Sequence, residues 1–110
     1  MIFDTVSTTT IIIQEKSSIV ELVKKMQTTY PKFINDNVIV NLSVMRTMTL
    51  DDLGEFLELS KQHRHAKHSF VIVTDKVNLD DLPDDLVVVP TLQEAYDVVE
   101  MEEMERDLGF

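Results

Sequence analysis

Residues 37–60, NVIVNLSVMRTMTLDDLGEFLELS, place a buried strand, a loop and the start of a helix in direct succession. The run NVIVNLS (37–43) is apolar and led by β-branched residues, which is typical of a strand covered on both faces. Thr49 precedes Asp52 by three residues, a spacing that predicts a helix N-cap. The inward stripe of this helix is Leu53, Phe56, Leu57 and Ser60. We see no break before Lys67 and predict one continuous helix up to that residue.

The same alternation of strands and helices continues on both sides of this stretch. Residues 2–16 predict two short strands, and Ser18 begins a helix that runs to about Thr29 and stops at Pro31. Further buried strands are predicted at 69–75 and 85–91. A last helix follows Thr91, and its inward residues are Leu92, Ala95, Tyr96, Val99 and Met104.

The order is therefore strand, strand, helix, strand, helix, strand, short connection, strand, helix. Alternation of this kind indicates parallel strands joined by right-handed crossovers. The connection between residues 75 and 85 has room for one or two helical turns. We predict a single α/β domain over residues 1–110, with a mixed, mostly parallel sheet of about five strands and three main helices. It closes with an acidic C-terminal helix at about 91–108.

Composition excludes several classes of function. Twenty acidic residues against ten basic ones give a formal net charge of −10, which argues against nucleic acid or an anionic membrane as the main partner. The chain has no cysteine, so disulfides and thiolate chemistry are excluded. A glycine-rich phosphate loop is absent, and we predict no cofactor. The first ten residues do not resemble a signal peptide, and no segment reaches membrane-spanning length, which predicts a cytoplasmic protein.

The three histidines of the chain all lie in HRHAKH (63–68), with the H-x-H-x-x-H spacing that metal-dependent hydrolases use. Two observations favour a different interpretation. Lys61, Arg64 and Lys67 make the segment locally basic, which repels a divalent cation, and such residues are favoured at a helix C-terminus. His63 and His65 also lie on different faces of a helix. We interpret the segment as a helix end without a metal site; a hydrolase that uses His63, His65 and His68 is the alternative.

Residues 41–64, NLSVMRTMTLDDLGEFLELSKQHR, resemble the signature of STAS domains, the family of the anti-sigma factor antagonists. In that family a strand ends in a D-L-S-like turn, and a D-S-S-G-L-G-x-L-L-like motif begins the second helix. The segment T-L-D-D-L-G-E-F-L (49–57) matches it at Leu53, Gly54 and Leu57. The order of strands and helices agrees over most of residues 2–100.

The resemblance implies a non-catalytic regulatory module that binds a switch kinase or an anti-sigma factor. The contact residues expected from it are Ser43, Arg46, Thr47, Thr49, Asp51 and Asp52. In the family the first serine of the motif is phosphorylated, but Leu50 occupies that position here. Two alternatives follow from this departure. Either Thr49 is the phospho-acceptor, or Asp51 and Asp52 supply a permanent negative charge where the family places a phosphate.

The whole chain, through its ending VVVPTLQEAYDVVEMEEMERDLGF (87–110), also resembles a group of small bacterial proteins that are often labelled ribonuclease Z. The residues do not match that activity, because the metal ligands, the length and the positive charge of a tRNA-processing nuclease are lacking. This resemblance implies an accessory protein that associates with a neighbouring nuclease.

The acidic segment EMEEMERD (100–107) continues an apolar stripe through Met101, Met104 and Leu108. An acidic helix with an exposed methionine edge predicts docking of a partner or of a second copy, so a homodimer through the C-terminal helix is a further possibility.

Overall fold

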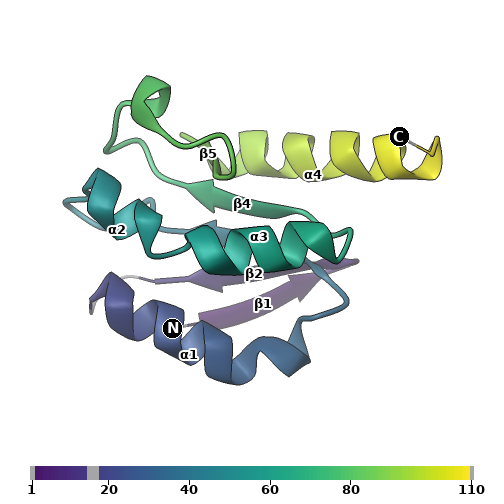
Figure 1. The fold of residues 1–110 in the computed structure, drawn as a ribbon, viewed down its shortest axis with the longest axis horizontal. Helices are drawn as coiled ribbons and strands as arrows, with labels where there is room; N and C mark the ends of the chain where they lie inside the picture. Colours follow the sequence, from purple (N-terminus) through teal and green to yellow (C-terminus); the bar gives the residue numbers. More distant parts are fainter. Residues whose placement is uncertain (1, 15–17, 110) are drawn as a thin grey trace.

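The computed structural model describes residues 2–14 and 18–109 (Figure 1). Its strands are β1 (Ile2–Val6), β2 (Thr9–Ile13), β3 (Asn37–Asn41), β4 (Phe70–Val73) and β5 (Val87–Val89). Its α-helices are α1 (Ile19–Thr29), α2 (Leu50–Gly54), α3 (Leu57–His65) and α4 (Leu92–Asp107). Two short 3₁₀ helices, η1 (Tyr30–Lys32) and η2 (Leu79–Asp81), complete the described elements.

In the described part of the chain, five strands form one sheet in the order β1-β2-β3-β4-β5. β1 runs antiparallel to β2, and the other neighbouring strands are parallel. Along one row of the sheet, Ile11 lies opposite Ile39, and Val71 lies opposite both Ile39 and Val87. The predicted α/β class, with a mixed and mostly parallel sheet, is confirmed.

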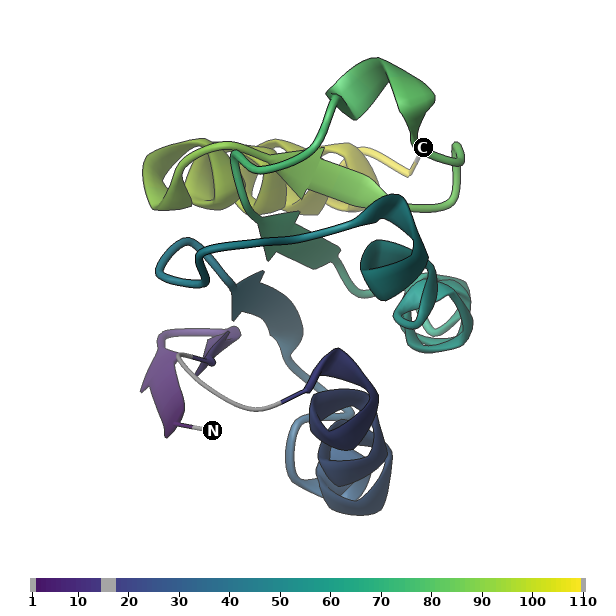
Figure 2. The same ribbon diagram turned by 90° about the vertical axis from the view of Figure 1, so that its left-hand side faces the viewer.

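The alternation of side chains along the strands builds two apolar clusters, one on each face of the sheet. α1, α2 and α3 cover the first face, and α4 covers the second (Figure 2). The strand residues of the first cluster are Ile12, Val38, Val40, Phe70, Ile72 and Val88. Those of the second cluster are Ile11, Ile39, Val71 and Val73, which pack with Ala95 and Val99 of α4. Because both faces of the inner strands are covered, these strands have the continuous apolar sequences from which they were predicted.

The predicted helix between Thr49 and Lys67 is wrong in one respect, because it is two helices with a turn at residues 55–56. The amides of Glu55 and Phe56 donate to carbonyls three residues back, on Asp52 and Leu53, which tightens the chain locally. Gly54 precedes the turn and disfavours a continuous helix by about 1 kcal/mol. The turn allows Leu53 and Phe56 both to be fully buried.

Met104 was predicted on the inward side of the last helix, and this is wrong, since the side chain is 61% exposed. The apolar contacts of α4 with the sheet end at Val99. Beyond that residue, the inward positions carry Glu102, Glu103 and Arg106, which make polar contacts instead. None of the helices described in the structure is long and apolar enough to cross a membrane.

Candidate partner-binding surface

The segment at residues 43–54, here called the 43–54 surface, follows the C-terminal end of β3. The side-chain oxygen Oδ1 of Asn41 accepts hydrogen bonds from the amide and the hydroxyl of Ser43, at 3.1 and 2.7 Å. This local turn ends the strand. Leu42 and Met48 are buried on either side of the loop and fix it to the core. The carboxyl ends of parallel strands are where ligands commonly bind in open α/β sheets.

Thr49 is the N-cap of α2, as the spacing predicted. Its Oγ1 accepts from the Asp52 amide, and its own amide donates to Asp52 Oδ2, each at 3.1 Å. This reciprocal capping box satisfies two amides that a helix start leaves without partners. The Asp52 carboxylate therefore accepts a hydrogen bond within the segment and is half-buried, whereas Asp51 beside it is exposed.

The structure places five of the six predicted contact residues on the exterior: Ser43, Arg46, Thr47, Thr49 and Asp51. It also exposes two apolar side chains that were not predicted as contacts, Val44 at 59% and Leu50 at 43%. Each of the two could have been recognised in the sequence as an apolar residue that does not fit the periodicity of the neighbouring strand or helix. Apolar groups next to an arginine and a carboxylate are a composition that suits a protein interface.

Replacing Thr49 by alanine should lower the free energy of unfolding by about 1 kcal/mol, because the Asp52 amide loses its capping oxygen. Urea denaturation of both proteins at one pH measures the difference. Thr47→Ala is the matched control, since Thr47 is an exposed threonine in the same loop, and a loss below about 0.5 kcal/mol is expected there. Equal losses in the two variants would show that the cap does not stabilise α2.

The first histidine of the segment HRHAKH lies in the core of the protein. His63 is fully buried, with Nδ1 2.7 Å from the Tyr30 hydroxyl and Nε2 2.6 Å from the Asp36 carbonyl. The carbonyl can only accept, so Nε2 carries the proton, and Nδ1 accepts from Tyr30. Both ring nitrogens of His63 are thus engaged with protein groups and are not free to ligate a metal in this arrangement.

The position of the other two histidines agrees with this conclusion. His65 is exposed and His68 is half-buried, with its ring centroid 5.3 Å from that of His63. Within residues 2–14 and 18–109, no three His, Cys, Asp or Glu side chains are placed to hold a metal ion. The segment is a helix end as predicted, because α3 ends at His65, but His63 in that last turn is also a core residue. Its partners come from η1 and the loop before β3, which helical spacing does not reveal.

Acidification should destabilise the fold through His63. Burial lowers the pKa of His63 because the imidazolium loses its hydration, and the charges of His68 and Arg64 lower it further, against the opposing effects of the Asp36 carbonyl and carboxylate. Below the ordinary histidine value of about 6.5, the unfolded chain therefore binds a proton that the folded chain does not. The unfolding free energy is expected to fall as the pH decreases from about 7 to about 5.

Denaturant midpoints measured across this pH range test the expectation. His65→Gln is the control, because His65 is exposed and its replacement should leave the pH dependence unchanged. His63→Gln should flatten the dependence, whatever its own effect on stability. A slope that persists in His63→Gln assigns the pH dependence to other groups.

Several solved structures have this fold. The crystal structure of a candidate anti-sigma factor antagonist from Thermotoga maritima has a TM-score of 0.66 at 20% identity, over 89% of this chain and 92% of that chain. The NMR structure of the same protein has a TM-score of 0.67 at 21% identity, over 89% and 86%. A serine-to-glutamate variant of RsbS from Moorella thermoacetica has a TM-score of 0.65 at 11% identity, over 90% and 93%.

Neither a protein-family model nor a curated protein sequence matches the chain significantly. At 11–21% identity the likeness is one of fold, and it extends over about nine-tenths of the chain. The predicted STAS-like fold of the anti-sigma factor antagonists is thereby confirmed.

Proposed function

We propose that this protein is a non-catalytic regulatory module that binds another protein through the 43–54 surface. The observation that carries the proposal is the pair of exposed apolar side chains, Val44 and Leu50, beside Arg46 and Asp51 on an anchored loop. The partner class is a switch kinase or an anti-sigma factor, in keeping with the motif at residues 49–57 and with the names of the structural neighbours. We place this interaction in the cytoplasm.

The negative charge at this surface is constitutive in our proposal. Leu50 occupies the position of the family's phospho-acceptor and cannot be phosphorylated. Asp51 is exposed and presents a fixed carboxylate to a partner, whereas the Asp52 carboxylate is bound to the Thr49 amide. Of the two aspartates, Asp51 is therefore the one that substitutes for a phosphate.

Phosphorylation of Thr49 is the competing form of regulation. It would modify the oxygen that caps α2, and it would add negative charge next to the Asp52 carboxylate. The intact mass of the protein purified from its native source decides between the two forms, because a constitutive charge requires no phosphorylated fraction.

Affinity purification from native extract tests the proposal, with Asp51→Lys as the test variant. Asp51 takes no part in the capping box, so the substitution changes the surface charge without removing the cap. Asp4→Lys is the matched control, because Asp4 is an exposed aspartate on β1, an edge strand that is separated from β3 by β2. A kinase or anti-sigma factor retained by the wild type and Asp4→Lys, and bound about tenfold more weakly by Asp51→Lys, is the expected result.

The other outcomes have distinct meanings. Recovery of a ribonuclease Z that depends on Asp51 would make the protein a nuclease accessory and replace the regulatory partner. A partner retained equally by all three proteins would place the interface elsewhere. If the wild type retains nothing specific, the proposed role of the 43–54 surface is wrong.

A further inference from the structure

α4 and the β1–β2 hairpin form a groove on the exterior that the proposed function does not use. It has a volume of about 470 Å³ and is lined on its apolar side by Val6, Tyr96, Val99 and Met104. A second hollow of about 300 Å³ lies on the neighbouring side of α4, against Met101 and Leu108. Glu100 and Met104 line both hollows, which therefore form one surface, here called the α4 groove.

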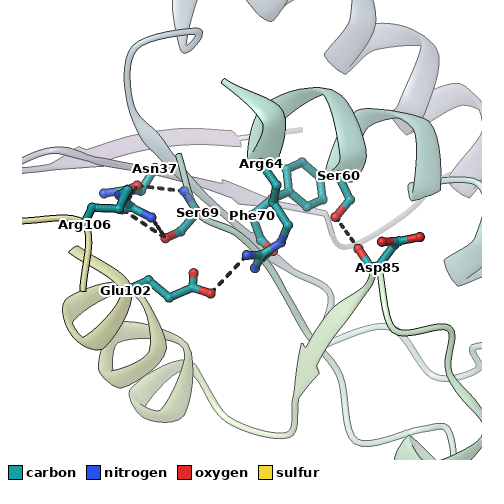
Figure 3. A network of polar contacts seen from close by, with 8 residues as sticks. All are labelled: Asn37, Ser60, Arg64, Ser69, Phe70, Asp85, Glu102 and Arg106. Atoms are coloured by element: carbon teal, nitrogen blue, oxygen red, sulfur yellow. Dashed lines mark hydrogen bonds and ion pairs between the residues drawn. The ribbon is translucent and has the colours of Figure 1, made fainter. Parts of the chain in front are cut away.

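The C-terminal half of α4 has polar side chains facing the protein and apolar side chains facing solvent, which is the reverse of an ordinary surface helix. Its inward positions are polar: Glu102 contacts Arg64 at 3.0 Å, and Arg106 donates to Asn37 Oδ1 at 3.1 Å (Figure 3). Its outward positions carry Met101, Met104 and Leu108, which are 54%, 61% and 71% exposed. An apolar stripe normally faces the core. Apolar side chains gathered on the solvent side mark an interaction surface.

The groove is formed before any partner binds, because polar contacts hold both of its walls. Glu103 Oε1 accepts from the Thr8 hydroxyl at 3.1 Å, which joins α4 to the hairpin, and from Asn37 Nδ2 at 3.0 Å, which joins it to β3. Figure 3 shows Arg106 held between Asn37 and Ser69. A preformed site loses little conformational entropy on binding.

The negative charge of α4 indicates which kind of partner the α4 groove would bind. Between Leu92 and Asp107, seven carboxylates accompany one arginine, and the whole chain has a net charge of −10. Three of these carboxylates, on Glu100, Glu103 and Asp107, line the larger hollow. A second copy would bring two acidic helices together, whereas a basic segment would be attracted. A groove with apolar side chains along a helix suits the apolar face of another helix.

We propose that the α4 groove binds a basic amphipathic helix of a partner protein. The apolar face of that helix packs on Met101, Met104 and Leu108, and its lysines or arginines face Glu100 and Glu105. This surface is separate from the 43–54 surface. The hairpin precedes Thr9 at the start of β2, and the 43–54 surface follows Asn41 at the end of the parallel strand β3. The two therefore lie at opposite ends of the sheet and can be occupied together.

The test uses the full chain and a synthetic peptide of leucine and lysine, with leucines at helical intervals so that the peptide forms a basic amphipathic helix. Amide chemical shifts are followed by NMR during titration. A peptide of the same composition in scrambled order controls for charge alone. Saturable shifts confined to residues 6–9 and 96–108, with the scrambled peptide binding at least about tenfold more weakly, are expected.

Variants assign the contacts. Met104→Ser and Glu100→Lys should each weaken peptide binding by about tenfold. Their matched controls are Val20→Ser on α1 and Glu58→Lys on α3, which change exposed residues on helices of the opposite face and should bind as the wild type does. All four positions are exposed, and circular dichroism confirms that each variant is folded. Asp51→Lys should also bind the peptide normally, so this result is independent of the 43–54 surface.

Three results would overturn the proposal. The scrambled peptide could bind equally well, which would show that charge alone accounts for the binding. The shifts could centre on residues 43–54, which would assign the peptide to the other surface. Light scattering could also show a dimer that Met104→Ser dissociates, in which case a second copy of the chain occupies the groove.

Discussion

Replacing Phe56 by alanine is expected to lower the free energy of unfolding by about 3–5 kcal/mol. Phe56 lies in the turn between α2 and α3, is fully buried, and has its ring centroid 6.5 Å from that of Phe70 on β4. Truncation would leave a cavity between the helices and the first face of the sheet. A domain of this size is stable by only about 5–15 kcal/mol, so the loss is a large fraction of the total.

Denaturant unfolding of the wild type and of Phe56→Ala measures this loss. Glu55→Ala is the neighbouring control, since Glu55 is exposed, and its effect should stay within about 0.5 kcal/mol. Phe56→Leu keeps most of the buried volume and should cost less than about 1.5 kcal/mol. If Phe56→Ala is no more destabilised than Glu55→Ala, the turn does not anchor α2 to the core.

Replacing Asn37 by alanine is expected to cost about 3 kcal/mol, the second largest effect. The buried Asn37 amide oxygen accepts from the Ser69 amide at 2.9 Å and from Arg106, and the amide nitrogen donates to Glu103. One substitution thus leaves the buried Ser69 amide without its partner and removes one contact each from Arg106 and Glu103, which keep their hydrogen bonds to Ser69 and Thr8. Each buried polar group left without a partner costs about 1–3 kcal/mol.

Thermal and denaturant unfolding of Asn37→Ala measure this cost. Asn35→Ala is its control, because Asn35 is an exposed asparagine two residues earlier, in the turn that precedes β3. Its stability should be close to that of the wild type. A loss in Asn37→Ala no greater than that of the control would mean that water replaces the side chain and that the α4 contacts do not depend on it.

The elements that could be predicted from the sequence are those with local causes. The β-branched run of β3 and the Thr49–Asp52 capping box each depend on only a few neighbouring residues, and both occur as predicted. The break after Gly54 could not be predicted in this way. Its cause is the simultaneous burial of Leu53 and Phe56 against strands that lie elsewhere in the sequence.

The same distinction applies to the candidate site. That residues 43–54 form an exposed loop followed by a helix start could be predicted from the pattern, but the half-buried state of Asp52 and the exposure of Val44 could not. His63 is the clearest case. Its burial depends on Tyr30 and Asp36, which are distant in the sequence, so the helical periodicity around residue 63 does not reveal them.

The order of the strands has a consequence for how the chain folds during synthesis. Each of the strands that the structure describes pairs with its neighbours in the sequence, so the sheet can grow in the direction in which the ribosome produces it. α4 follows all five strands, and it is the helix that covers Ile39, Val71 and Val73. Until α4 emerges, a completed sheet carries an uncovered apolar face. A nascent chain that stalls before residue 92 is therefore a substrate for chaperones rather than a smaller folded domain.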